Sequence, residues 1–150
     1  MRGKKGDGGG CARLLWWGGG RGVGVRVCEM KVISWNVRGL SGFEKRKEVR
    51  ALVQEKCMFI LCLQETKLQV VNDGICVALW GNQSISYSFR PSVGASGGLL
   101  TVWDSSKVEV WSSISFDHTL IIHERFKKSN EDFYLFNVYA PYDVRERKLL

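Results

Sequence analysis

The stretch Met30-Lys31-Val32-Ile33-Ser34-Trp35-Asn36 is the starting point for predicting the fold. Its β-branched and aromatic residues predict a strand. A continuous apolar run over residues 58–63 predicts a second strand, one that is covered on both faces. Because a helix is predicted between them, these segments form a strand–helix–strand unit with parallel strands and a right-handed crossover.

The segment between these two strands has the pattern of an amphipathic helix that extends to about Lys56. Ser41 and Glu44 have the spacing of a capping box, which predicts where the helix begins. Apolar residues recur at helical spacing and predict the buried face, which comprises Val49, Leu52, Val53 and Cys57. The charged residues between them are expected to lie on the solvent side.

From about residue 84 the pattern changes to short apolar segments separated by turn residues. The predicted strands are 84–89, 98–103, 107–115, 119–126 and 133–139. Connections as short as these favour hairpins and antiparallel pairing. One parallel pair followed by an antiparallel series predicts an α+β fold, with a mixed, mostly antiparallel sheet and a flanking helix.

Residues 1–29 differ in composition from the rest of the chain. They hold ten of its 17 glycines, and six Lys or Arg residues against two acidic ones. Because glycine is entropically costly to order, we predict a flexible extension over 1–29 and a folded domain over 30–150. An RNA-binding Gly/Arg tail is an alternative, although the segment lacks a repeated RGG unit.

The net charge of +7 favours polyanionic partners such as nucleic acid, but +4 of it lies in residues 1–29. No apolar run reaches the roughly 20 residues that span a bilayer. The apolar patch at 14–17 is also shorter than the core of a secretory signal. We therefore expect an intracellular protein, neither secreted nor inserted in a membrane. The five cysteines include no C-x-x-C pair, which argues against a zinc or disulfide role.

Polar side chains stand at the ends of the first two predicted strands, where Asn36 ends one and Glu65 ends the other. The carboxyl ends of parallel strands lie at the same edge of a sheet. A carboxylate there can bind Mg²⁺, which prefers oxygen ligands. An amide beside it can hold a phosphate oxygen or orient a water molecule. The alternatives are a solvated charge for Glu65 and a turn former before Gly39 for Asn36.

Four short motifs resemble those of the endonuclease/exonuclease/phosphatase superfamily, which includes DNase I-like and apurinic-site nucleases. In chain order they are ISWNVRGL at 33–40, QETK at 64–67, GASGGL at 94–99 and NVYAP at 137–141. Their wording is most similar to the endonuclease domain of plant LINE-type (non-LTR) retrotransposons. The resemblance covers roughly residues 30–150 and implies the first half of a four-layer, DNase I-like α/β sandwich.

The resemblance also implies a role for particular residues. Glu65 matches the metal-binding carboxylate of the family, and Asn36 matches an active-site Asn near the metal and the scissile phosphate. Tyr139 matches a Tyr whose phenol reaches the phosphate, although a half-buried strand aromatic is the alternative. Arg38 and Lys67 could contact the nucleic-acid backbone, unless they are merely solvated. The implied cofactor is Mg²⁺, the implied partner is DNA, and the implied location is the nucleus.

The family also uses a later Asp-x-Asn motif and a terminal Asp-His pair, which this sequence does not match. Asp143 is too close to Tyr139 for the first, while His118 and His123 precede Tyr139 and are interpreted as ordinary turn and strand residues. We therefore expect little or no activity from this chain alone. We also expect it to supply the first sheet and one helix, leaving a bare inner face and a marginal or aggregation-prone monomer.

Three functions remain open from the sequence. The first is a fragment of a Mg²⁺-dependent phosphodiesterase, a DNA endonuclease of retroelement origin. The second is a non-catalytic nucleic-acid-binding module that uses the basic charge. The third is a phosphatase of the same superfamily that acts on a small phosphoester.

Overall fold

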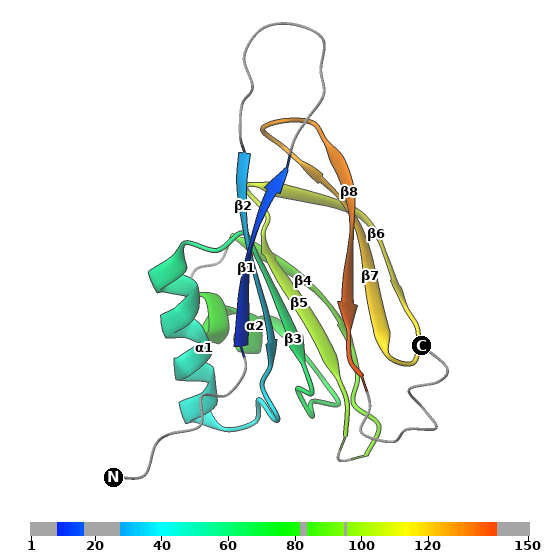
Figure 1. The fold of residues 1–150 in the computed structure, drawn as a ribbon. Coiled ribbons are helices and arrows are strands. Elements are labelled where there is room, and N and C mark those ends of the chain that lie inside the picture. Colours follow the sequence, from blue (N-terminus) through cyan, green and yellow to red (C-terminus); the bar gives the residue numbers. More distant parts are fainter. Residues whose placement is uncertain (1–8, 17–27, 82–83, 95, 141–150) are drawn as a thin grey trace, which may run out of the picture.

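A computed structural model describes residues 9–16, 28–81, 84–94 and 96–140 of the chain. Its elements, in chain order, are β1 (Gly9–Trp16), β2 (Cys28–Asn36), α1 (Phe43–Lys56), β3 (Ile60–Gln64), α2 (Asp73–Trp80), β4 (Ile85–Arg90), β5 (Leu99–Asp104), β6 (Val108–Ser115), β7 (Thr119–Phe126) and β8 (Asp132–Val138). The strands form two sheets, and both helices lie on the outer side of the larger sheet (Figure 1).

The larger sheet has the strand order β1-β2-β3-β5-β4. Its centre is the predicted strand–helix–strand unit, since β2 and β3 pair in parallel from Val32↔Ile60 to Asn36↔Gln64, with α1 between them in the sequence. The other three pairings are antiparallel. This arrangement confirms the predicted α+β class and its mixed sheet.

The smaller sheet consists of the antiparallel strands β6, β7 and β8. Its pairing shifts register between Val110 and Ser112, so Trp111 forms a bulge in β6. Leu120 and Ile122 of β7 point toward the larger sheet and are fully buried. Together with residues of the larger sheet they form a core between the two sheets.

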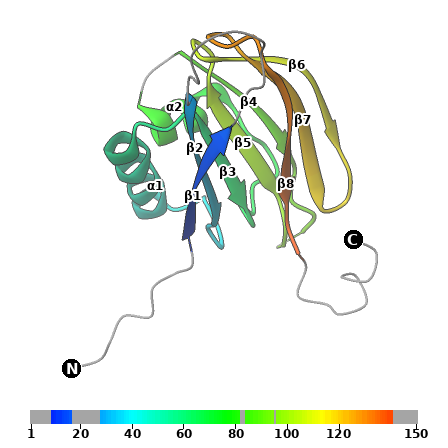
Figure 2. The same ribbon diagram turned by 45° about the horizontal axis from the view of Figure 1, so that its top comes forward.

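Three layers result: helices, large sheet and small sheet (Figure 2). One core lies between the helices and the large sheet, and a second lies between the two sheets. This corrects the expectation of a single sheet with one helix and a bare inner face. The inner face is covered because the chain leaves the first sheet after β5 and continues as the second sheet.

The start and end of α1 differ from the prediction. Its N-cap is Gly42, which makes no side-chain capping bond, so the expected capping box of Ser41 and Glu44 is wrong. Val49 and Val53 are buried as expected, but Cys57 is exposed. Cys57 adopts a left-handed conformation (φ 51°) that ends the helix instead of extending its apolar face.

Part of the N-terminal stretch is a strand. Residues Gly9–Trp16 form β1, which pairs antiparallel with β2 from Gly9↔Trp35 to Trp16↔Cys28. The glycine content had favoured a flexible extension over all of 1–29, whereas 9–16 and 28–29 are strand residues. The domain boundary at residue 30 stays a prediction.

Candidate active site

The candidate site lies where β2 and β3 end side by side. The last pair of their parallel ladder is Asn36↔Gln64, so Glu65 follows directly at the same sheet edge. Figure 1 shows that β2, β3 and β8 run in the same direction, with their carboxyl ends at the lower edge of the molecule. The sequence therefore placed Asn36 and Glu65 correctly at one edge.

Asn36 is exposed at the end of β2 and orders the loop that follows. Its side-chain oxygen accepts a hydrogen bond from the backbone N–H of Arg38 at 3.2 Å. Arg38 itself has a φ of 53°, a left-handed conformation that non-glycine residues rarely adopt. The turn-forming role considered for Asn36 is thus present.

The loop after β3 is held by backbone hydrogen bonds on both sides. The N–H of Gly39 donates to the carbonyl of Glu65 at 2.8 Å, and the N–H of Thr66 donates to the carbonyl of Gly98 at 3.1 Å. Glu65 and Lys67 both have positive φ, 54° and 56°. The glycine segment at 94–99 therefore helps to fix the backbone of the segment 64–67, which carries Glu65.

Glu65 presents a carboxylate that is only partly solvated. Its side chain is 20% exposed, and its Oε1 lies 3.5 Å from the Nζ of Lys67, whose side chain is 39% exposed. This ion pair neutralises the carboxylate at an accessible position, where it contributes about 1 kcal/mol or less. A cation or a phosphate that reaches the site therefore meets one acidic and one basic group side by side.

Tyr139 follows β8 and packs partly buried against the core between the sheets. Its backbone N–H donates to the carbonyl of His118 at 2.8 Å, and the two rings have centroids 6.4 Å apart. His118 lies in the β6–β7 turn, as the sequence indicated, but the fold brings that turn beside Tyr139. Only the tertiary arrangement could show this neighbour.

A buried pair of amides connects these two parts of the site. The Nε2 of Gln64 donates to the Oδ1 of Asn137 at 2.7 Å, although the residues are 73 positions apart in the chain. This bond places the end of β8 over the end of β3, so Tyr139 and Glu65 lie at the same edge. Both amides belong to motifs quoted above, but no contact between them was predicted, because only the packing of the second sheet shows that they face the core.

The two predicted metal ligands offer oxygen donors of the kind that Mg²⁺ accepts. Glu65 supplies a carboxylate and Asn36 an amide, and Mg²⁺ is often held by one or two carboxylates with waters and substrate phosphate. Among the residues that the structure describes, no three His, Cys, Asp or Glu side chains cluster as a metal site. The donor set thus fits a weakly held cation whose remaining ligands are water and phosphate.

Basic side chains surround this edge. Arg38 and Lys67 follow Asn36 and Glu65, as predicted, and Arg90 ends β4 at the same side because β4 and β3 both pair antiparallel with β5. The Nη2 of Arg90 lies 2.9 Å from the Oδ1 of Asp117 in the β6–β7 turn. Arg90 was not among the predicted residues, since only the sheet order brings it here.

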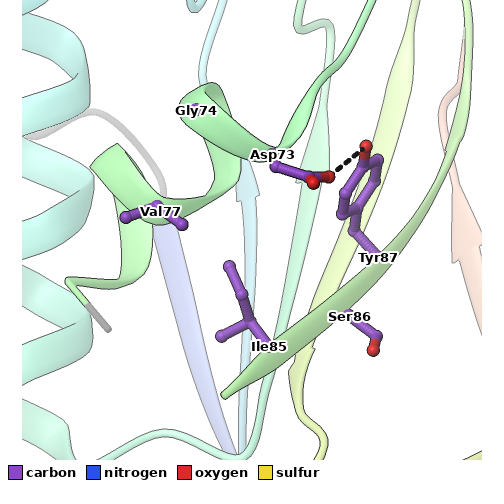
Figure 3. A pocket seen from close by; sticks show the side chains of 6 residues that line it. All are labelled: Asp73, Gly74, Val77, Ile85, Ser86 and Tyr87. Carbon is purple, nitrogen blue, oxygen red and sulfur yellow. Dashed lines mark hydrogen bonds between the residues drawn. The ribbon is translucent and has the colours of Figure 1, made fainter. Parts of the chain in front are cut away.

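A pocket of about 730 Å³ lies elsewhere, between the first turn of α2 and β4 (Figure 3). Its walls include Val77 and Ile85, and the phenol of Tyr87 donates to the Oδ1 of Asp73 at 3.0 Å. None of the predicted site residues lines this pocket. Its volume alone does not favour it over the sheet edge, where the polar groups converge.

Comparison with known proteins connects this fold to solved structures. No family model matches the chain, and no curated protein matches it. The AP endonuclease LMAP from Leishmania major is similar at 22% identity and a TM-score of 0.56, over 75% of this chain and 40% of that one. The Xenopus laevis APE2 catalytic domain is similar at 20% identity and a TM-score of 0.51, over 80% and 49%.

D. rerio TDP2 complexed with single strand DNA product is similar at 20% identity and a TM-score of 0.51, over 71% of this chain and 44% of that one. These neighbours are DNase I-like members of the endonuclease/exonuclease/phosphatase superfamily. The likeness shows that this chain has a part of that fold, and the chain spans less than half the length of each of these three neighbours. No helix in the described ranges is long and apolar enough to cross a membrane.

Proposed function

We propose that this chain carries one part of a divalent-metal-dependent site that cleaves phosphodiester bonds in DNA. The observation that supports this most is that β2, β3 and β8 end at one edge, and that Asn36, Glu65 and Tyr139 stand at or directly after those ends. The neighbours include one endonuclease by name and a protein solved with a DNA product. The wording of the four motifs supports a LINE-type retroelement origin.

In this proposal each residue has a separate task. Glu65 and Asn36 hold the cation, which polarises a phosphoryl oxygen and stabilises the leaving oxyanion when it is bound. The Tyr139 phenol donates a hydrogen bond to the phosphate. Arg38 and Lys67 position the nucleic-acid backbone. We expect the rate to be low, because Glu65 is the sole carboxylate that we assign to the cation.

The test is nicking of supercoiled plasmid by the purified chain with Mg²⁺, with EDTA as a control. Glu65→Ala should abolish the activity, and Tyr139→Phe should reduce it. The matched control is Glu55→Ala, which removes an exposed carboxylate from α1 that pairs with Lys56. Nicking that survives Glu65→Ala would reject the assigned site and point to a contaminating nuclease.

A second function, nucleic-acid binding without cleavage, is favoured by the net charge of +7. It predicts binding to DNA or RNA that weakens steeply with salt. Replacing Arg38 and Lys67 by Gln should lower the salt slope by about two, because each phosphate contact contributes about one. Strong binding by folded protein that never nicks DNA would favour this function over the first. Release of phosphate from small phosphoesters would instead favour a phosphatase.

A further inference from the structure

The buried amides at the site end of the sandwich differ in chemistry from the rest of the core between the sheets. That core is otherwise built mainly from aliphatic and aromatic side chains such as Ile60, Leu120 and Ile122. Asn137 is 1% exposed and Gln64 is 7% exposed. A polar pair in this position requires a reason, because burying amides costs free energy unless their hydrogen bonds are made.

The hydrogen bonds of this amide pair (Gln64 and Asn137) cross from one sheet to the other. Asn137 Oδ1 accepts from Gln64 Nε2 at 2.7 Å, and Asn137 Nδ2 faces the carbonyl of Leu100 and the Oγ1 of Thr101, each at 3.2 Å. Gln64 Nε2 also donates to the Oγ of Ser34 at 3.0 Å. The pair therefore connects β8 to β2, β3 and β5.

Apolar side chains of similar size could hold the two sheets together as well as this pair does, since hydrogen bonds contribute little net stability. Apolar side chains would not fix the position of one sheet relative to the other. Sheets packed through apolar contacts can shift along one another, whereas hydrogen bonds of defined length and angle permit one relative position. The amide pair thus differs from an apolar pair in that it fixes the register of β8 over β3.

That register determines the distance between two candidate site residues. Gln64 directly precedes Glu65, and Asn137 lies two residues before Tyr139, about 7 Å along an extended chain. We propose that Gln64 and Asn137 are positioning residues, which set the place of the Tyr139 phenol relative to the Glu65 carboxylate. This proposal rests on the proposed function for its purpose, but the positioning itself can be measured without catalysis.

The test uses the full chain labelled with 3-fluorotyrosine, with the fluorine resonance of Tyr139 assigned through Tyr139→Phe. The variant is Gln64→Met with Asn137→Leu, which keeps side-chain volume and removes the polar atoms. We expect the Tyr139 resonance to shift or split, while the resonances of Tyr87 and Tyr134 stay in place. The control is Ser88→Ala, which removes a different contact between the sheets, the one with Ser113.

Tyr134 makes the readout specific, because it lies on the same strand, β8, as Asn137. A loss of general stability would change Tyr87, Tyr134 and Tyr139 alike, whereas a loss of positioning changes Tyr139 alone. An unchanged Tyr139 resonance in the folded double variant would overturn the proposal. If the double variant does not fold, the single variant Gln64→Met decides by the same criterion.

Mn²⁺ separates this proposal from the proposed function. Addition of Mn²⁺ should broaden the Tyr139 resonance of the unmodified chain through a cation at Glu65, and Glu65→Ala should remove that effect. In the double variant the broadening should weaken, because paramagnetic broadening falls steeply with distance. Broadening that is absent, or that survives Glu65→Ala, counts against the metal site. The metal-free spectrum then still decides on the amide pair.

Discussion

Gly98 allows β5 to approach the loop that carries Glu65. Its φ is +88°, and a Cβ added there would lie 2.5 Å from the Oγ1 of Thr66 and 3.3 Å from the backbone nitrogen of Lys67. Both the backbone conformation and the contact distance therefore favour glycine. Gly98→Ala should lower the free energy of unfolding by roughly 1–3 kcal/mol, the usual range for such backbone strain, as measured by urea titration.

The neighbouring Gly97 provides the matched control for this prediction. Its φ is +73°, but no atom lies within 4 Å of an added Cβ. Gly97→Ala should therefore lower the free energy of unfolding only through backbone strain, and by less than Gly98→Ala does. Equal losses for both variants would mean that the contact with Thr66 is unimportant.

Glu124 is the buried carboxylate of β7, and it faces the core between the sheets. Neither of its carboxylate oxygens has a hydrogen-bond partner, and burial raises the pKa of this group from 4.5 to about 8. Between these two values the folded chain keeps a proton that the unfolded chain releases. The free energy of unfolding should therefore fall as the pH rises from 4.5 to about 8.

Glu124→Gln removes this titration. The free energy of unfolding of the variant, relative to that of the unmodified protein, should rise across the same pH range. The total rise should be several kcal/mol, at about 1.36 kcal/mol per pKa unit. Urea titrations at intervals from pH 4.5 to 9 measure the difference. The control is Glu109→Gln, which changes an exposed carboxylate of β6. A difference for Glu124→Gln that does not vary with pH would show that the carboxyl is ionised in the folded chain.

How much of the site the sequence could predict depends on the kind of residue. Asn36 and Glu65 were predictable, because parallel strands bring their ends to one edge whatever lies above the sheet. Tyr139 required the family resemblance. Gln64, Asn137 and Glu124 could not be assigned, since a polar residue in a strand faces solvent or core only once the second sheet has its place.

At the scale of elements, the strand segments were the most predictable feature. The strand predicted at 119–126 is the observed β7, and the predicted segments for β4, β5, β6 and β8 differ from the observed bounds by one residue at one or both ends. Strands separated by turn residues are predicted well because the pattern is local.

The helices were less predictable. Helix α2 was not predicted. It begins after Asn72, whose side-chain oxygen accepts a hydrogen bond from the backbone N–H of Ile75. Its eight residues, Asp73–Trp80, are mostly apolar, so they lack the helical periodicity from which α1 was inferred.

The outer face of the small sheet is apolar at several positions. Its exposed large residues include Trp111, Ile114, Tyr134 and Phe136, and the last is 59% exposed on the edge strand β8. Exposed apolar residues on an open edge favour association between chains. Phe136→Lys should reduce self-association, measured by sedimentation velocity over a range of concentrations, and should leave the melting temperature nearly unchanged.

Leu135 is the control on the same strand. It points inward and packs against the core between the sheets, so Leu135→Lys should unfold the protein. If Phe136→Lys left the sedimentation profile unchanged, another surface would mediate any association. Native melting of Leu135→Lys would contradict the assigned inner and outer faces of β8.

At the scale of the whole molecule, the expectation of a bare sheet face was wrong for a reason that local patterns cannot reveal. The alternation in 119–126 shows that one face of this strand is apolar, but not which surface that face meets. The structure packs it against β3 and β5. The inner face is therefore buried, and the loss of burial from which a marginal monomer was expected does not occur.

Strands β2, β3 and β5 contribute residues to both cores, which predicts that the helices and both sheets unfold together. Leu120, 1% exposed, lies in the core between the sheets, and Val53 of α1, 4% exposed, lies in the core between helices and sheet. Leu120→Ala should cost about 2–5 kcal/mol, the usual range for such a cavity. The variant should also speed amide hydrogen exchange in α1, although Leu120 belongs to the other core. Val53→Ala should correspondingly speed exchange in β7. Effects confined to the mutated side would show two units that unfold independently, and the small sheet would then be free to leave the larger one.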